Sequence, residues 1–434
     1  MKALSLDEAA SIVRPIDTLA VPLGPGQPAA FLHALGKRDD WSDLKVFGAL
    51  LLDLYPLFAR AGVELRSGFF GPAERALAAA GHAVHFVPGD FRRFAAMAEA
   101  LNPRVMATSV APADADGGFS LSLHAGATVD ALARCGRDPE RVLIVEVNAQ
   151  LPRTLGLPPN HSHRLRAEDV DFVIESDRDV PTLADPAASD VDRAIAEHVA
   201  RFIPDGATLQ TGIGGVPSRV AQLLAEGDGG DYGVHSEMFT TGLMHLHEAG
   251  KVSNRKGIFD GFSVSTFALG TRELHDWLDG NDQVRFLPVD QVNDPGLIGR
   301  NRKMVSINGA LSVDLASQVV ADTIEGRQFS GIGGHEDFVG GASLSEGGHS
   351  IVCLPATATV GGQTISRIQA MLPLGSIVTT PRHQLDVVIS EFGVAELRGR
   401  SVDERANALI EIAHPDFRDA LRRIHASPPW SARE

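Results

Sequence analysis

Short apolar runs alternate with helical patterns along almost the whole chain, and this alternation restricts the fold more than any other feature of the sequence. The run RVLIVEVNA at 141–149 is rich in β-branched residues and is typical of a buried strand, as is VDFVIESD at 170–177. The segment AERALAAAG at 73–81 has helical composition and ends in glycine, a common helix terminus. Alternating strands and helices predict α/β layers built on mainly parallel sheets.

The chain has 434 residues, more than one typical core contains, which predicts two or three domains. The clearest linker is the segment 178–192, which is rich in Pro, Ala and Asp. Behind it, DVDRAIAEHVARFI has apolar residues at near-helical spacing, and Asp190 is suited to cap the start of that helix. We therefore expect two α/β domains, residues 1–187 and 188–434.

Charge and cysteine content exclude several classes of protein. With 39 basic and 55 acidic residues the formal net charge is −16, which argues against binding to nucleic acid or to an anionic membrane surface. The two cysteines, Cys135 and Cys353, are far apart and form no CxxC, so we expect neither a disulfide framework nor a cysteine zinc site. His161 and His163 lack an evident third ligand, so no metal site is expected. Without an apolar run of ~18 residues or a signal peptide, the sequence predicts a soluble cytoplasmic protein.

The sequence contains three glycine-rich loops, each of which lies next to a predicted strand or helix. Glycine lets a backbone approach a ligand closely, and a helix N-terminus behind the loop presents free N–H groups to an anion. Neither of the first two loops completes the dinucleotide fingerprint, because Pro217 and Glu336 stand where the third glycine is required. Each loop alone is compatible with a tight turn, but three together favour a backbone-lined pocket. Their glycines are Gly212, Gly214 and Gly215, then Gly331, Gly333 and Gly334, then Gly361 and Gly362.

Two glutamates stand at the ends of predicted strands, where ligands bind in open α/β sheets. Glu237 lies in GVHSEMFTTG after a short strand, and Glu391 follows the buried strand LDVVIS. A carboxylate in such a place can act as a general base or as a nucleophile. The alternative for each is that it caps a following helix. No GxSxG motif is present, which argues against a hydrolase triad on this fold.

The order of several motifs resembles the acetyl-CoA hydrolase/transferase family and, within it, the 4-hydroxybutyrate CoA-transferases. The resemblance covers nearly the whole chain and rests on TGIGGVP, GVHSEMFTTG, VNDP, MVSINGALSVDL, GIGGHEDFVGGA, ISEFGVAELRG and IAHPDFRDAL, together with N-terminal segments such as PLGPGQPAAFLHAL. It implies two α/β domains of the CoA-transferase (NagB/RpiA-like) type, with mainly parallel sheets, flanking helices and the active site between them.

The resemblance also implies roles for individual residues. The family's catalytic glutamate matches Glu237, in the second predicted domain, and its second active-site glutamate matches Glu391. The loop that holds the thioester oxygen matches GIGG at 331–334, with the amides of Gly333 and Gly334 as donors. The active-site asparagine is matched to Asn308 and the strand-end glutamine to Gln210. The remaining loop glycines are expected to line the site for CoA. Two departures, His335 and the segment QVND at 291–294, put the substrate in doubt.

The function implied is transfer of CoA between a short-chain acyl-CoA and a carboxylic acid, such as acetate, butyrate or 4-hydroxybutyrate, through a thioester between Glu237 and CoA. CoA and acyl-CoA are the expected substrates, and no tightly bound cofactor is expected. We also expect a homodimer or a higher homo-oligomer, because most soluble oligomers are symmetric assemblies of one chain. One alternative is acyl-CoA hydrolysis by the same residues. Another is a non-catalytic CoA-binding protein on the same fold. A nicotinamide-dependent dehydrogenase is a weaker alternative because neither loop completes GxGxxG.

Overall fold

The computed structural model describes residues 1–184 and 186–426, and the chain divides into two compact units. Unit 1 contains residues 1–184 together with 236–239 and 262–294, and unit 2 contains the rest. Two segments that follow residue 187 in the sequence therefore belong to unit 1 by their contacts, and one of them carries Glu237. The linear division at residue 187 stays a prediction, and each unit is described here by itself.

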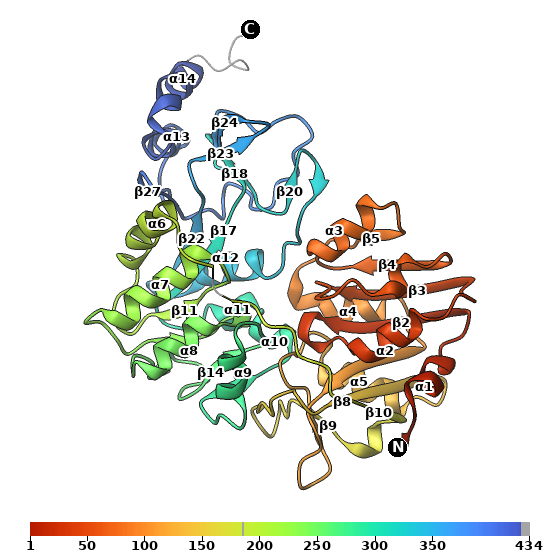
Figure 1. Ribbon diagram of the computed structural model, residues 1–434. Coiled ribbons are helices and arrows are strands. Elements are labelled where there is room, and N and C mark those ends of the chain that lie inside the picture. The colour runs from red at the N-terminus through yellow and green to blue at the C-terminus, as the bar shows by residue number, and fades with distance from the viewer. Residues whose placement is uncertain (185, 427–434) are drawn as a thin grey trace. The chain divides into compact units, whose positions relative to one another are not determined.

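Unit 1 is built on an eight-stranded parallel sheet (Figure 1). In spatial order its strands are β1 (Lys2–Ala3), β10 (Phe172–Ser176), β8 (Val142–Asn148), β6 (Val105–Val110), β2 (Ile16–Leu23), β3 (Asp43–Ala49), β4 (Val63–Ser67) and β5 (Val84–Phe86). The helices around it are α1 (Leu6–Ile12), α2 (Ala29–Leu35), α3 (Pro72–Ala79), α4 (Phe94–Glu99) and α5 (Val129–Arg137). The strands predicted at 141–149 and 170–177 and the helix predicted at 73–81 are confirmed.

Both faces of this sheet are buried, and successive strand residues enter different hydrophobic clusters. Leu19, Val46 and Ile144 pack with α1, α2 and α3 in one cluster. Their neighbours Ala20 and Phe47 pack with α4 and α5 in the other. Burial on both faces explains why the central strands β6 and β8 are buried at nearly every position, whereas β4, nearer the edge, alternates buried and half-buried residues.

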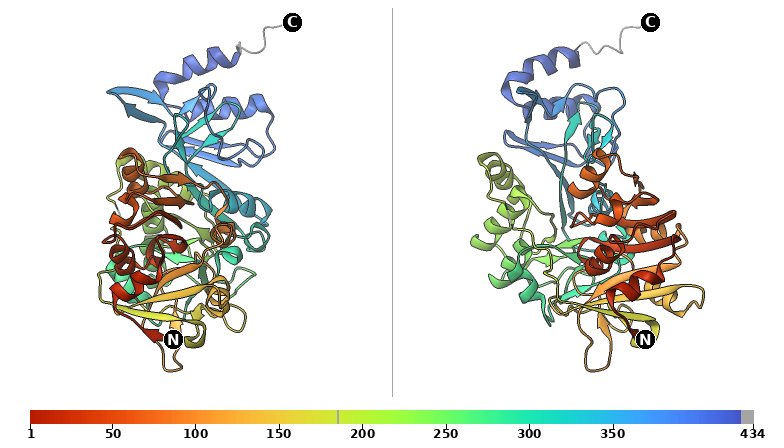
Figure 2. Two further views of the ribbon diagram at one scale, coloured as in Figure 1. Left: turned by 90° about the vertical axis from the view of Figure 1, so that its right-hand side faces the viewer. Right: turned by 45° about the vertical axis from the view of Figure 1, so that its right-hand side comes forward.

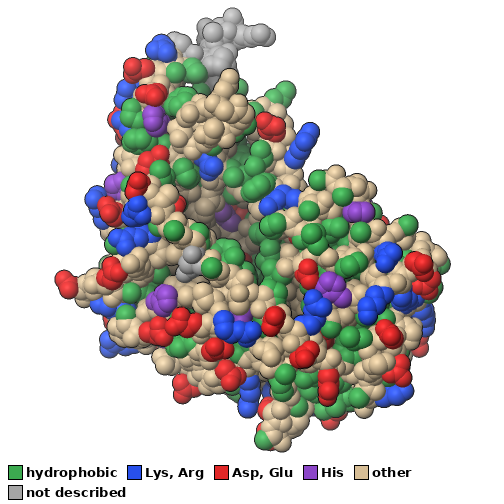
Figure 3. Space-filling model, in the orientation of Figure 1, with side chains coloured by type: hydrophobic (Ala, Val, Ile, Leu, Met, Phe, Trp, Pro, Cys, Tyr) green, Lys and Arg blue, Asp and Glu red, His purple; other side chains and the backbone are tan. Residues whose placement is uncertain are grey.

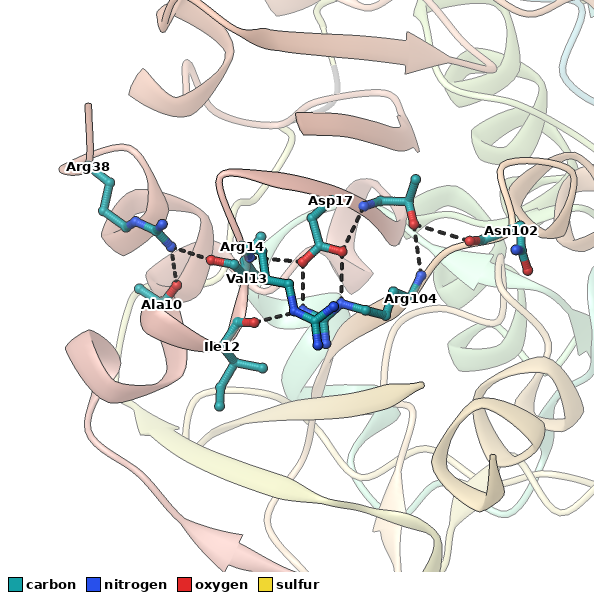
Figure 4. Close-up of polar contacts among 9 residues, drawn as sticks. Ala10, Ile12, Val13, Arg14, Asp17, Arg38, Asn102 and Arg104 are labelled. Atoms are coloured by element: carbon teal, nitrogen blue, oxygen red, sulfur yellow. Dashed lines mark hydrogen bonds and ion pairs between the residues drawn. The ribbon is translucent and has the colours of Figure 1, made fainter. Parts of the chain in front are cut away.

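An Arg–Asp network closes the end of α1 and ties it to the sheet (Figure 4). Asp17 at the start of β2 is paired with Arg104 through two hydrogen bonds of 2.6 and 2.9 Å, and it also accepts from the amides of Arg14 and Thr18. Arg104 donates to the carbonyl of Ile12, and Arg38 donates to two further carbonyls of the same turn. Cations at a helix C-terminus satisfy carbonyls that have no partner within the helix.

Unit 2 contains a six-stranded sheet in which five strands are parallel and the edge strand β27 is antiparallel. In spatial order the strands are β12 (Gly233–Val234), β11 (Thr208–Gln210), β17 (Met304–Gly309), β22 (His349–Cys353), β26 (Val387–Ser390) and β27 (Gly393–Glu396). Its longer helices are α6 (Asp190–Ala200), α7 (Gly215–Glu226), α8 (Thr241–Glu248), α12 (His335–Leu344), α13 (Val402–Glu411) and α14 (Pro415–Ala426). Sheets with flanking helices in both units confirm the predicted α/β class.

The helix predicted behind the linker is α6, but its cap differs from the prediction. Ser189, not Asp190, is the N-cap, because its hydroxyl accepts from the amide of Asp192 while the Asp192 carboxylate accepts from the amide of Ser189. In this reciprocal capping box the backbone amides of both Ser189 and Asp192 have hydrogen-bond acceptors, whereas a single cap would satisfy only one of them. At the C-terminal end, α13 and α14 lie side by side and α13 packs on β27 (Figure 2).

Charged side chains of both signs are interspersed over the face drawn in Figure 3, so the net negative charge of the chain does not form a single acidic field there. Among the described residues, no helix has both the length and the apolar character needed to cross a bilayer.

Candidate active site

Glu237 lies directly before β13 (Met238–Phe239), and the backbone of unit 1 holds it firmly. Its carbonyl accepts hydrogen bonds from the amides of Thr266 at 3.0 Å and Phe267 at 3.2 Å and from the hydroxyl of Ser265 at 2.9 Å. The β13 strand runs parallel to β15 (Phe267–Ala268). The Glu237 side chain is half-buried. The carboxylate is thus mounted on a fixed backbone at a partly accessible position.

Asn293 holds the Glu237 carboxylate from the side. It follows α10 (Val289–Val292), is fully buried, and donates from Nδ2 to Oε2 of Glu237 at 2.7 Å. A hydrogen bond of this length to a carboxylate is charge-assisted and fixes the plane of the carboxyl group. From the sequence, Asn293 belongs both to the family motif VNDP and to the departing segment QVND, and the active-site asparagine is matched to Asn308 instead. The feature of the sequence that could have indicated Asn293 is its position directly after the apolar residues of a short buried helix.

Three of the predicted site residues lie together in unit 2, at the carboxyl edge of its sheet. Gln210 ends β11, Asn308 lies near the end of the adjacent β17, and the two side chains are joined by a bond of 3.4 Å. Glu391 follows β26 at the same edge, and its Oε2 accepts from the amide of Ala356 at 2.8 Å. No helix follows Glu391, which occupies the turn between antiparallel β26 and β27, so it does not cap a helix.

The first glycine loop joins β11 to α7 at this same edge. Gly214 adopts a φ of 120°, which favours glycine, and is the N-cap of α7. Gly215 is required for packing, since a Cβ there would lie 2.5 Å from Oδ2 of Asp192. Gly212 faces open space, with no atom within 4 Å of an added Cβ. The first N–H groups of α7 have no partner within the helix and no side-chain cap, a geometry suited to an anionic group.

The second glycine loop precedes α12 in the same way. Gly333 has a φ of 55° and Gly334 is the N-cap, so the amides of the first helical turn have no partner within the helix. Gly331 is buried at the entry to the loop. His335 begins the helix, and its Nε2 is 2.9 Å from the hydroxyl of Thr380. Burial lowers the pKa of His335 to about 4, so this imidazole is neutral at pH 7.

Gly361 and Gly362 have a different local setting. They form the two-residue turn of the hairpin between β23 (Thr357–Val360) and β24 (Gln363–Ser366), with φ values of 57° and 80°. Positive φ at both central positions is the requirement of the preferred hairpin turn. Turn geometry is therefore a sufficient reason for these two glycines, and their role in a ligand site stays a prediction.

His235, two residues before Glu237, packs in the core of unit 2. It is fully buried, its Nδ1 is 2.9 Å from Nδ2 of Asn301, and its ring lies beside those of Phe259 and Phe338. The Nδ2 group of Asn301 can only donate, so Nδ1 of His235 accepts and the neutral imidazole carries its hydrogen on Nε2. In the described part of the chain, no three His, Cys, Asp or Glu side chains are grouped so as to hold a metal ion.

Known proteins resemble this chain in sequence and in fold. A profile of the acetyl-CoA hydrolase/transferase C-terminal domain matches residues 270–424. Succinyl-CoA:cyclohexane-1-carboxylate CoA transferase of Geobacter metallireducens is 36% identical over 433 residues, which cover 98% of this chain and 96% of that protein. The crystal structure of RipA from Yersinia pestis superimposes with a TM-score of 0.87 at 33% identity, over 97% of this chain and 96% of that one. That of 4-hydroxybutyrate CoA-transferase from Porphyromonas gingivalis gives 0.77 at 30% identity over the same shares. On these grounds the chain belongs to the acetyl-CoA hydrolase/transferase family and is a CoA-transferase.

Proposed function

We propose that the protein moves CoA between a short-chain acyl-CoA and a carboxylic acid, with Glu237 as the nucleophile. The observation that carries this proposal is the fixed carboxylate of Glu237, whose Oε2 accepts from Asn293 at 2.7 Å while the backbone carbonyl of the same residue accepts three hydrogen bonds. A nucleophile that is already held in the reactive orientation does not have to lose conformational entropy during the reaction, which lowers the barrier.

The reaction runs through two covalent intermediates on Glu237. A carboxylate oxygen attacks the thioester carbonyl, the C–S bond breaks, and a mixed anhydride and CoA thiolate form. The thiolate then attacks the glutamyl carbonyl, the anhydride C–O bond breaks, and the first acid leaves as its carboxylate. The enzyme now carries a glutamyl-CoA thioester, which a second carboxylate converts back by the same steps. Charge is conserved throughout, and covalent catalysis divides one difficult exchange into easier steps.

A carboxylate suits this exchange better than a hydroxyl. The anhydride it forms is activated toward both thiolate and carboxylate, whereas the ester formed on serine is too stable for ready return to CoA. For the oxyanions of these steps we propose the amides of Gly333 and Gly334 as donors, since each such donor contributes roughly 2.7–4 kcal/mol in other enzymes. Gln210, Asn308 and Glu391 are proposed to act in the same reaction, and Gly212, Gly214, Gly215 and Gly331 to line the path of CoA.

Trapping the thioester tests the role of Glu237 directly. The protein is incubated with acyl-CoA, treated with borohydride and mapped by peptide mass, and we expect reduction of Glu237 to the alcohol. Glu237→Gln should show neither reduction nor transfer, whereas Glu248→Gln, a change at an exposed glutamate of α8, should behave as the unmodified protein. Full transferase activity in Glu237→Gln would eliminate the mechanism.

Hydrolysis is the second candidate activity because water can replace the acceptor acid on the same intermediates. Measuring thiol release from acyl-CoA with and without added acetate separates the two. A transferase releases little free thiol in either condition, while a hydrolase releases it without the acid. A panel of acyl-CoA donors against acetate, butyrate, succinate and 4-hydroxybutyrate, read by product mass, identifies the acid. The predicted homodimer and cytoplasmic location are also proposals, the first of them tested by light scattering.

A further inference from the structure

A cationic pocket lies in unit 2, outside the residues proposed for transfer. It has a volume of about 220 Å³, and its lining residues are Ala316, Ser317, Arg382, His383, Arg400, Val402 and Arg405. No carboxylate lines it, although acidic residues outnumber basic ones in this chain by 55 to 39. The three guanidinium groups make this pocket positively charged, although the chain as a whole has a negative net charge.

The topology of the sheet separates this pocket from Glu391. Arg382 precedes β26 and Arg400 follows β27, and these two strands are antiparallel neighbours. The start of β26 and the end of β27 therefore lie at one edge of the sheet, whereas Glu391 lies in the turn at the other edge. Four strand residues at ~3.3 Å each separate the two edges by roughly 13 Å.

One wall of the pocket is preorganised. Arg405, in the first turns of α13, donates from Nε to the hydroxyl of Ser317 at 3.0 Å and from Nη2 to the carbonyls of Arg382 and Leu385 at 2.6 and 3.2 Å. Ser317 is 1% exposed. Its hydroxyl oxygen accepts from Arg405, and among the described residues no acceptor takes its hydrogen. A buried hydroxyl that lines the pocket with a donor hydrogen still available is suited to a ligand oxygen.

The guanidinium groups make no close ion pairs in the described part of the chain, although the charges of Asp386 and Glu404 act on Arg405 and Arg400. Within the described residues, none of Arg382, Arg400 and Arg405 has a carboxylate within ion-pair distance. The nearby acids are engaged elsewhere, because Asp386 pairs with Arg398 and Glu404 caps α13 through Ser401. Burial lowers the pKa of Arg405 and the positive charge of Arg382 lowers it further, while the charge of Asp386 opposes both effects only in part. An anion between the two guanidinium groups would relieve that repulsion.

We propose that this pocket binds a phosphate group, either free or carried by a small molecule. Three guanidinium groups offer more donors and more charge than one carboxylate can accept, whereas a phosphate dianion accepts paired hydrogen bonds from several arginines. The volume suits one phosphate or diphosphate rather than a whole drug-sized ligand, for which pockets of ~300–1,000 Å³ are usual. A bound phosphate would join α13 to the loop before β26 and to Ser317. It would do so at the edge of the unit 2 sheet opposite to the edge that carries Glu391.

Calorimetric titration tests the proposal with inorganic phosphate, diphosphate, ADP and succinate. We expect saturable binding of phosphate or diphosphate, and a dissociation constant at least about tenfold higher in Arg382→Gln/Arg400→Gln, the loss expected for one charge-assisted hydrogen bond. Neither side chain has a hydrogen bond in the described structure, so the change should leave folding intact, and Arg400→Gln alone provides a milder variant. Arg134→Gln, an exposed arginine of α5 without an ion pair, is the matched control and should bind as the unmodified protein does.

Each outcome has a defined meaning. Loss of ADP binding in the double variant together with loss of phosphate binding identifies the phosphate as one carried on a nucleotide, and loss of phosphate binding alone identifies free phosphate. Three results would overturn the proposal: no saturable heat with phosphate, diphosphate or ADP, equal binding in the double variant, or succinate bound as tightly as phosphate. None of these measurements depends on transferase activity, so failure here leaves the role of Glu237 unaffected.

Discussion

Replacing Asn293 by alanine removes a side-chain donor to the Glu237 carboxylate and tests whether that contact serves catalysis. The contact is 2.7 Å long, and Asn293 is fully buried. In the second step of the proposed reaction, thiolate attack on the glutamyl carbonyl places a full negative charge on one glutamyl oxygen. If Oε2 is that oxygen, the Asn293 hydrogen bond becomes stronger at the transition state than in the anhydride, which is the condition for a catalytic effect.

The magnitude follows from the type of contact. A hydrogen bond to a charged group contributes about 1.5–3 kcal/mol, and about 1.4 kcal/mol corresponds to a factor of ten in rate, so the loss is about 10- to 150-fold. A full oxyanion donor contributes more, about 10²–10³ in kcat. We therefore expect Asn293→Ala to lower kcat by about a hundredfold with little change in the KM for acyl-CoA, because the contact is to the enzyme's own carboxylate.

Steady-state transfer between acyl-CoA and acetate measures kcat and KM separately. Gln291→Ala, in the same short helix, is the control for local disturbance. Borohydride trapping adds a second readout, since slower thiolate attack should lower the amount of reducible thioester at early times. Asn293→Asp places a second carboxylate beside Glu237 and should lose more activity at about pH 8 than at about pH 5, where one of the two can hold a proton. If Asn293→Ala kept kcat within about threefold while remaining folded, the assigned role of this contact would be wrong.

Two further predictions concern stability. Asp17→Asn should lower the free energy of unfolding by about 2–4 kcal/mol in urea denaturation at neutral pH, because it leaves the partly buried Arg104 without its carboxylate. Burial acts to raise the pKa of Asp17, but hydrogen bonds from Arg104 and two amides outweigh it and hold the pKa below its ordinary value. The difference between the two proteins should thus be constant above about pH 4 and shrink as the pH falls through the pKa of the folded state; a constant difference down to about pH 2 would contradict this. Gly215→Ala should cost about 1–3 kcal/mol, because its Cβ would lie 2.5 Å from Oδ2 of Asp192, whereas Gly212→Ala should leave stability within about 0.5 kcal/mol; equal effects of the two changes would refute the packing argument.

Much of the fold could be predicted because the relevant signals are local. Residues 142–148 form a buried strand because their β-branched side chains are covered on both faces of the sheet. That coverage appears in the sequence as an apolar run from which only Glu146 and Asn148 depart. The glycines before α7 and α12 were predictable for the same reason, since a chain that turns from a strand or loop into a helix needs special backbone angles there. The cap at Ser189 was missed because Asp190 beside it has an equally suitable side chain.

The site was predictable only in part. Local sequence left Glu237 as either a reactive or a capping carboxylate, and the family resemblance selected the first. Local sequence also could not separate a ligand loop from a hairpin turn at Gly361 and Gly362, because both require positive φ. For Glu391, local sequence left open that it caps a following helix, while the structure has an antiparallel strand there.

By itself, the sequence determined the α/β class, the parallel sheets and the loops at strand ends. These properties follow from hydrophobic periodicity and backbone preference, which act over a few neighbouring residues. Tertiary structure alone decided that Asn293 holds Glu237 across 56 positions of the chain, that 236–239 belongs with unit 1, and that three arginines from separate segments line one pocket. Such pairings depend on which strands become neighbours in the folded chain, and no local pattern encodes that choice because burial rewards many arrangements of the same apolar runs.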